Sequence, residues 1–229
     1  MRWPPARAPG DYLEPYGDLI RQAREPVILH WLGEMFDPKL AGYWGSRDLD
    51  RATDTFVQLV NTHAAKVDGV KISLLDKDRE IALRPRLDPR VKVYTGDDFH
   101  YPELIRGDGA HHSHALLGIF DAIAPAAAAA LDRLAAGDEA GFDAIMAPTV
   151  PLARTIFEPP TQWYKAGIVF LAWLNGHQDH FTMLGGLQSA RSARHYATVF
   201  READACGLLR DPPLAARRMT TLMALHGID

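Results

Sequence analysis

The sequence contains a single cysteine, Cys206, so the chain cannot form an internal disulfide. It has no apolar run long enough to cross a bilayer, since the longest, residues 166–174, falls well short of the ~20 residues that a membrane helix needs. The net charge of −4 gives no reason to expect nucleic-acid binding. Residues 1–5 have no apolar segment behind their basic residue and do not fit a signal peptide. We therefore expect a cytoplasmic globular protein with neither nucleic-acid nor membrane partners.

The most informative residue that is present is Lys71, which lies inside the short apolar stretch 67–73. This stretch has the composition of a buried parallel strand. Burying an ammonium is costly unless it is paired or neutral. One reason for such a lysine is catalysis, because a lysine with a lowered pKa attacks a carbonyl and forms a Schiff base. The alternative is that Lys71 ends an edge strand and extends its ammonium to water.

Side chains alternate between the two faces of a strand, so Gly69 and Ser73 are expected on the same face as Lys71. Val70 and Ile72 then point to the opposite face, toward helices. An active-site lysine needs this arrangement: a small neighbour, a nearby hydroxyl group and apolar residues behind it. The pattern therefore favours a catalytic role for Lys71 with Ser73 beside it.

Strand-like and helix-like segments alternate through the first half of the chain, and only helices follow. Strands are expected at 27–31, 67–73, 91–94 and 115–120. Helices are expected at 11–24, 49–64, 77–84, 98–106, 125–136, 139–157, 161–174, 187–206 and 213–226. This order predicts an α/β fold, a partial barrel over residues 1–136 followed by a helical extension over residues 137–229.

Three motifs carry a resemblance to a known family. They are Gly69-Val70-Lys71, then Thr95-Gly96-Asp97-Asp98, then Leu134-Ala135-Ala136-Gly137-Asp138. The series resembles the C-terminal half of the dihydrodipicolinate synthase and N-acetylneuraminate lyase family, which are class I aldolases on a (β/α)8 TIM barrel. Segments 29–36 and 173–181 look typical of a bacterial branch that is dihydrodipicolinate-synthase-like. The resemblance covers residues from about 11 to the end.

The resemblance implies a lyase or aldolase in which Lys71 captures a 2-keto acid or a related carbonyl as an imine. His30 stands where the family has a proton-relaying tyrosine, and imidazole can do that work at neutral pH. Ser73, Thr95 and Asp97 are the expected substrate-binding residues, and Asp98 is expected to cap the following helix. The chemistry needs no cofactor and no metal. Family members commonly form homo-oligomers, which is the expectation here.

One strand precedes the Lys71 strand where the family has five. The chain is therefore expected to hold only strands 5–8 of the barrel, and its activity is in question. Two alternatives stay open. A metal-dependent hydrolase or lyase would use the histidine and aspartate clusters of residues 111–114 and 177–180 and leave Lys71 structural. A catalytically dead structural fragment would use neither.

Overall fold

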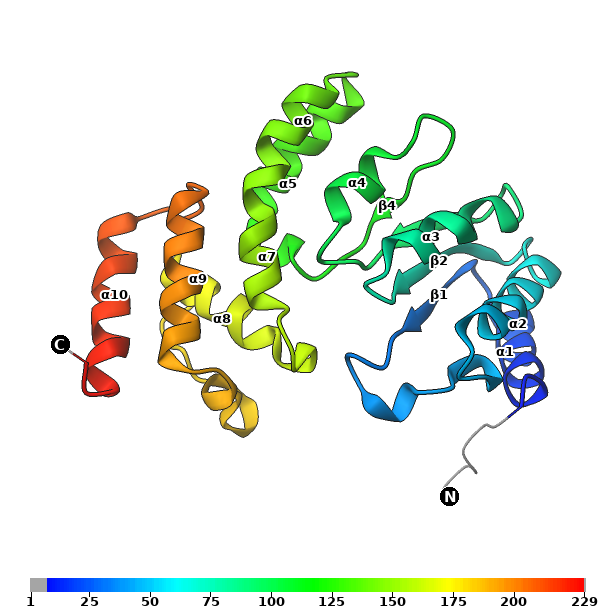
Figure 1. Ribbon diagram of the computed structural model, residues 1–229, viewed down its shortest axis with the longest axis horizontal. Coiled ribbons are helices and arrows are strands. Elements are labelled where there is room, and N and C mark those ends of the chain that lie inside the picture. Colours follow the sequence, from blue (N-terminus) through cyan, green and yellow to red (C-terminus); the bar gives the residue numbers. More distant parts are fainter. Residues whose placement is uncertain (1–7, 229) are drawn as a thin grey trace. The chain divides into compact units, whose positions relative to one another are not determined.

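The computed structural model describes residues 8–228, which form a mixed α/β fold and so confirm the α/β part of the predicted fold class (Figure 1). The chain divides into two compact units, of which the first ends at Leu116 and the second begins at Leu117. The boundary expected after residue 136 had placed the helix of residues 120–135 with the strands, whereas this helix belongs to the second unit.

The first unit is built around a four-stranded parallel sheet. Its strands are β1 (Val27–Leu32), β2 (Val67–Ser73), β3 (Lys92–Thr95) and β4 (His114–Ala115), and their order in the sheet is β1-β2-β3-β4. Its helices are α1 (Gly10–Gln22), α2 (Leu49–Thr62), α3 (Lys77–Leu83) and α4 (Tyr101–Arg106), with short 3-10 helices at Pro38–Leu40, Tyr43–Gly45 and Arg84–Arg86. Parallel neighbours cannot be joined by a tight turn, so α2, α3 and α4 lie in the crossovers between them.

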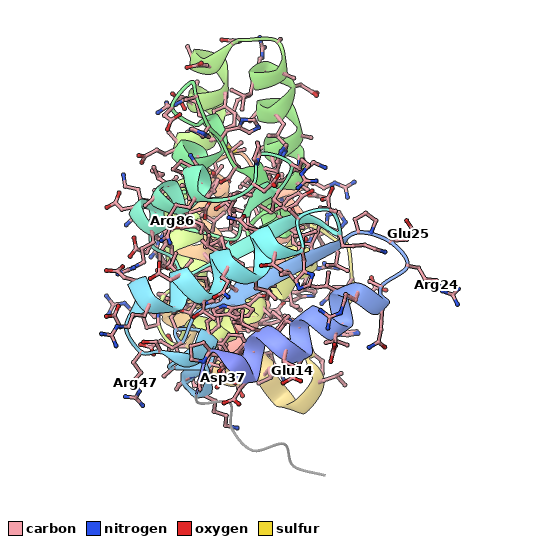
Figure 2. The ribbon with its side chains drawn as sticks, turned by 90° about the vertical axis from the view of Figure 1, so that its right-hand side faces the viewer. Glu14, Arg24, Glu25, Asp37, Arg47 and Arg86 are labelled. Atoms are coloured by element: carbon pink, nitrogen blue, oxygen red, sulfur yellow. The ribbon has the colours of Figure 1, made fainter. Side chains whose placement is uncertain are left out.

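One face of the sheet forms the core of this unit. Leu29 and Trp31 of β1 and Val70 and Ile72 of β2 are buried in a cluster that includes Phe56 of α2. Figure 2 views the unit from this helix side, with α1 and α2 in the foreground and the charged side chains of their surface directed outward. Because side chains alternate along a strand, the other side chains of β1 and β2 lie on the opposite face of the sheet.

An aromatic cluster around Trp44 fills the space between β1, α1 and α2. Trp44 is fully buried, and its ring lies against those of five residues, with centroid distances from 4.9 Å to 6.3 Å: Tyr12, Tyr16, Trp31, Tyr43 and Phe56. Trp44 has a φ of +66°, a left-handed conformation that is uncommon for a bulky residue. The packing of the cluster offsets this backbone strain.

Most elements of the first unit lie close to the predicted segments. Asp48 caps α2, because its carboxylate accepts from the backbone N–H groups of Asp50 and Arg51. The strand expected at 115–120 was wrong: β4 contains only two residues, and α5 begins at Phe120. A short apolar run does not distinguish a strand from the start of a buried helix. The helix expected from Asp98 begins at Tyr101, with His100 at its N-cap, so Asp98 is not the cap.

The second unit consists of helices over residues 117–228. They are α5 (Phe120–Ala135), α6 (Glu139–Met146), α7 (Val150–Ile156), α8 (Lys165–Leu174), α9 (Ala193–Ala205) and α10 (Pro212–Leu225), with 3-10 helices at Ala147–Thr149, Thr161–Trp163 and Leu184–Ala190. The single helices expected at 139–157 and 187–206 are each broken, the first at the 3-10 turn that contains Pro148. None of the helices within residues 8–228 has the length and hydropathy needed to span a bilayer.

Candidate functional site

Four side chains form a row across the face of the sheet opposite the core. The strand register pairs His30 with Lys71, Lys71 with Tyr94, and Tyr94 with His114. Residues paired in a parallel sheet point to the same face, so two imidazoles, an ammonium and a phenol lie side by side. Lys71 and Tyr94 are half-buried, whereas His30 and His114 are exposed. The sheet therefore brings the predicted pair Lys71 and His30 together and adds Tyr94, which the sequence analysis did not select.

His30 is held by the third predicted residue on this face. Its Nε2 lies 2.9 Å from Oγ of Ser73, which is 3% exposed. The pKa of His30 is lowered to about 4, first because the surrounding protein partly desolvates the imidazole and second because the charge of Lys71 repels the added proton. His30 is thus neutral at physiological pH. A neutral imidazole can accept a proton from a neighbour or pass one on.

Gly96 makes this close packing possible. A Cβ atom at Gly96 would lie 2.0 Å from Oγ of Ser73 and 2.9 Å from Cε of Lys71. Its backbone N–H donates to the carbonyl of Ile72 at 2.7 Å, which fixes the loop against the end of β2. Any side chain here would push Ser73 or Lys71 out of position. The packing around Lys71 therefore leaves room only for glycine at this position of the Thr-Gly-Asp-Asp motif.

A register irregularity in β2 places an acid next to the row. Pairing shifts between Val27 and Ile28, so that Asp68 has no partner of its own in β1. The Asp68 carboxylate accepts from the Tyr94 hydroxyl at 2.7 Å and from Lys92 Nζ at 2.8 Å, and these two bonds lower its pKa. The pKa of Tyr94 is raised by the same bond to Asp68. The site thus contains a Tyr-Asp pair that alternation alone could not reveal.

Thr95 is not brought to Lys71. It pairs with Ile72, faces the helices and is fully buried. Its hydroxyl donates to Oε2 of Glu80 at 3.0 Å and accepts from the backbone N–H of Asp97 at 3.1 Å. The period-two series of apolar residues Val91 and Val93 already predicts this face for Thr95. The position of Thr95 is that of a structural residue.

Asp97 is likewise engaged within its own loop. One carboxylate oxygen accepts from the backbone N–H groups of Phe99 and His100, and the other lies 3.0 Å from Nδ1 of His100. Asp97 is 1% exposed. It therefore closes the turn before α4 and does not join the row around Lys71.

A second polar cluster is buried behind the sheet, around Glu80. Ser113 donates to Glu80 Oε1 at 2.5 Å, and Arg84 donates to the Ser113 hydroxyl from Nε at 3.2 Å and from Nη2 at 3.0 Å. Glu80 is 1% exposed, and burial raises its pKa to about 7, against the opposing effect of its hydrogen bonds to Ser113 and Thr95 and of the nearby Arg84. The sequence offers only the i, i+4 spacing of Glu80 and Arg84 as a signal.

The histidine clusters do not form a metal site in the described part of the chain. The rings of His112 and His114 lie 5.0 Å apart, and His111 is exposed beside them. His177, Asp179 and His180 lie in the second unit and are exposed. Within residues 8–228 no group of three or more His, Cys, Asp or Glu side chains is arranged to hold a metal ion.

A cavity of about 390 Å³ opens at the carboxyl ends of β1 and β2. Leu32 and Gly33 border it on one side and Leu74 and Leu75 on the other, next in sequence to Ser73. Leu75 has a φ of +53°, which is uncommon for a bulky residue. Ligands of parallel α/β sheets commonly bind at the carboxyl ends of the strands, which is the end where this cavity lies, but its lining does not include Lys71 or His30.

Comparison with known proteins places the chain in one family. No curated protein matches it. A family model described as "Protein of unknown function (DUF993)" matches residues 4–228, which is nearly the whole sequence. The chain belongs to this family.

Proposed function

We propose that this protein is a Schiff-base-forming lyase or aldolase that captures a 2-keto acid or a related carbonyl compound on Lys71. The observation that carries the proposal is the position of Lys71 in β2, paired in register with a neutral His30 that is itself held by Ser73. Small and hydroxyl-bearing neighbours surround the lysine, as the resemblance to the dihydrodipicolinate synthase and N-acetylneuraminate lyase family requires. The reaction class rests on this geometry and on that resemblance.

In the proposed reaction the Lys71 amine adds to the substrate carbonyl carbon. Loss of water then gives a protonated imine, which withdraws electrons while a carbon–carbon bond forms or breaks. The pair Lys71 and His30 supports the proton movements. The positive charge of Lys71 lowers the pKa of His30. When the Lys71 ammonium loses its proton, the amine becomes able to attack, and His30 becomes a stronger base at the same time.

Tyr94 and Asp68 give the site a second proton donor and acceptor. The Tyr94 hydroxyl donates to Asp68, and Tyr94 is the register partner of Lys71 on the side opposite His30. A phenol so placed can protonate the carbinolamine oxygen as it leaves as water. We assign this protonation to Tyr94, and we assign the proton transfers at the Lys71 amine to His30.

We further propose that the sheet is part of a (β/α)8 barrel, namely strands 5–8. The strand order follows the sequence order, as it does in a barrel, whereas a doubly wound sheet reverses order at a switch point. The buried face of the strands packs on helices, and the opposite face carries the polar row. That polar face corresponds to the barrel interior, where an active-site lysine would stand.

The test is reductive trapping with borohydride in the presence of pyruvate, followed by peptide mass spectrometry. We expect an adduct at Lys71. Lys92 is the matched control, because it is an exposed lysine on the adjacent strand whose ammonium is paired with Asp68 at 2.8 Å. Lys92→Arg should keep the adduct, and Lys71→Arg should remove it.

Three results would contradict the proposal. An adduct spread over Lys92 and other surface lysines would indicate unspecific amine chemistry. No adduct with pyruvate or with a panel of other 2-keto acids and aldehydes would make Lys71 structural and favour the catalytically dead alternative. A divalent metal that copurifies at one equivalent and is needed for activity would instead favour the metal-dependent alternative.

A further inference from the structure

The second unit contains a cavity of about 500 Å³, and no residue of the Lys71 site is in its lining. It is formed by the end of α8, the segment that includes the 3-10 helix Leu184–Ala190, the start of α9 and the end of α10. Cavities of roughly 300–1,000 Å³ with a mainly apolar wall and a few polar groups are typical of small-molecule sites. This cavity therefore has the size and the mainly apolar wall of a small-molecule site.

The inner wall of the cavity is aromatic. Trp173 and Phe181 are stacked, with an interplanar angle of 14° and a centroid distance of 5.7 Å, and Tyr196 meets Phe181 edge-on at 5.1 Å. Trp173 is 9% exposed and Tyr196 1%. The Tyr196 hydroxyl donates to the backbone carbonyl of Gln188, which fixes the ring in place. Rigid rings of this kind favour a flat apolar ligand, because little side-chain freedom is lost on binding.

A buried guanidinium lines the same cavity. The side chain of Arg191 is 5% exposed and is held by backbone carbonyls, with Nη2 donating to Glu158 and Pro160 and Nη1 to Pro159. Its Nε is buried and has no hydrogen-bond partner among residues 8–228. A buried donor without an acceptor is costly, and the position of Arg191 in the cavity lining places this cost beside the cavity.

The charge of Arg191 is only partly balanced by the protein. The Glu158 carboxylate lies 3.7 Å from Nη1, but it is 48% exposed and also lies 2.7 Å from Nδ1 of His195. A second guanidinium, that of Arg218, lies 5.5 Å from the ring centroid of Trp173 but is not part of the cavity lining. The acid that lines the cavity, Asp179, is exposed. The inner wall therefore combines aromatic rings with positive charge.

We propose that this cavity binds a small organic anion with an aromatic body, its ring against Phe181 and Trp173 and its anionic group at Arg191. Such a site would give the protein a ligand distinct from the carbonyl substrate of the first unit. Exposed polar groups on Ser189 and Thr221 stand at the mouth of the cavity and could contact the ligand's outer edge. The proposal does not depend on the chemistry of Lys71.

Isothermal titration calorimetry of the full chain with naphthalene-2-carboxylate, and with the neutral 2-naphthamide as its counterpart, tests the proposal. We expect saturable binding of the carboxylate, about tenfold or more tighter than that of the amide, because the guanidinium bonds a charged acceptor more strongly. Arg191→Gln should remove this preference.

Two tryptophan substitutions test the location without touching Arg191. Thr221 is exposed on α10 at the mouth, and its hydroxyl donates to the carbonyl four residues earlier, so Thr221→Trp should obstruct the cavity and weaken binding about tenfold or more. Thr62 of α2 is exposed and makes the same i to i−4 bond, so Thr62→Trp should leave binding unchanged.

Three results would overturn the proposal: no saturable binding of the carboxylate, equal affinity for the amide, or unchanged binding in Thr221→Trp. If Arg191→Gln does not fold, the two probes on the wild-type chain and on Thr221→Trp still decide the question.

Discussion

The buried carboxyl of Glu80 predicts a pH-dependent loss of stability that Glu80→Gln should remove. In the unfolded chain its pKa is the ordinary 4.5, whereas in the folded chain burial raises it to about 7. An acid whose pKa is raised in the folded state contributes its full stabilisation only at pH values below its pKa in the unfolded chain. This contribution is lost as the pH rises from 4.5 through about 7, because the folded state must then ionise a group that is 1% exposed.

The magnitude follows from the size of the shift. Each pKa unit corresponds to about 1.4 kcal/mol, so the shift of Glu80 corresponds to about 3 kcal/mol between pH 4.5 and pH 8. His30 acts in the opposite direction: its folded-state pKa of about 4 makes stability rise from pH 4 to 6.5. His30 is exposed, so solvent screening makes its contribution smaller. The wild-type profile therefore combines two opposing slopes.

The assay is urea unfolding followed by circular dichroism at several pH values, reported as the difference between Glu80→Gln and wild type. Contributions common to both chains, including that of His30, cancel in this difference. We expect the variant to gain about 3 kcal/mol relative to wild type from pH 4.5 to pH 8. Glu103→Gln is the control, because Glu103 forms an exposed ion pair with Lys77 and should change the difference by less than about 1 kcal/mol. A flat difference curve for Glu80→Gln would refute the reasoning.

Three further predictions concern Lys71, Gly96 and Trp44. In Lys71→Met the pKa of His30 should rise above about 4, because the charge of Lys71 is removed, but stay below 6.5, because desolvation is the larger cause of its shift. Nuclear magnetic resonance titration of the imidazole measures this pKa. An unchanged pKa would contradict the prediction. Gly96→Ala should abolish trapping at Lys71, whereas Gly10→Ala, whose Cβ would meet nothing within 4 Å, should keep it. Trp44→Ala should reduce the free energy of unfolding by about 3–5 kcal/mol in urea melts, and a loss no larger than that of Trp163→Ala would argue against a packing role.

The sequence predicts the Lys71 strand well because all its signals are local. An apolar run around one lysine gives the strand, and alternation gives the face shared by Gly69, Lys71 and Ser73. The caps of α2 and α3 are equally local, since Asp48 and Asp76 bond backbone N–H groups within three residues. What these segments share is that no distant partner decides their structure.

The remainder of the site depends on partners far apart in the chain. Tyr94 lies in the row because the register of β2 and β3 pairs it with Lys71. Asp68 lies next to the row because of an irregularity in the pairing of β1 and β2, and the amino-acid composition gives no sign of this irregularity. The sequence around Glu80 predicts a polar helix with an exposed glutamate. In the structure Glu80 is buried and accepts a hydrogen bond from Ser113, which is 33 residues away in the chain. The end of the fourth strand was misjudged because apolar residues 117–119 continue into a helix and not along the sheet.

The aromatic cluster around Trp44 gives the two units different optical signatures. Trp31 and Trp44 are 3% and 0% exposed and lie among tyrosines, so their emission should be blue-shifted and fed by energy transfer from those phenols. In the second unit Trp163 is 36% exposed and Trp173 9%. The loss of this energy transfer on unfolding therefore reports the unit that contains Lys71. Its unfolding can be followed by fluorescence without any added label.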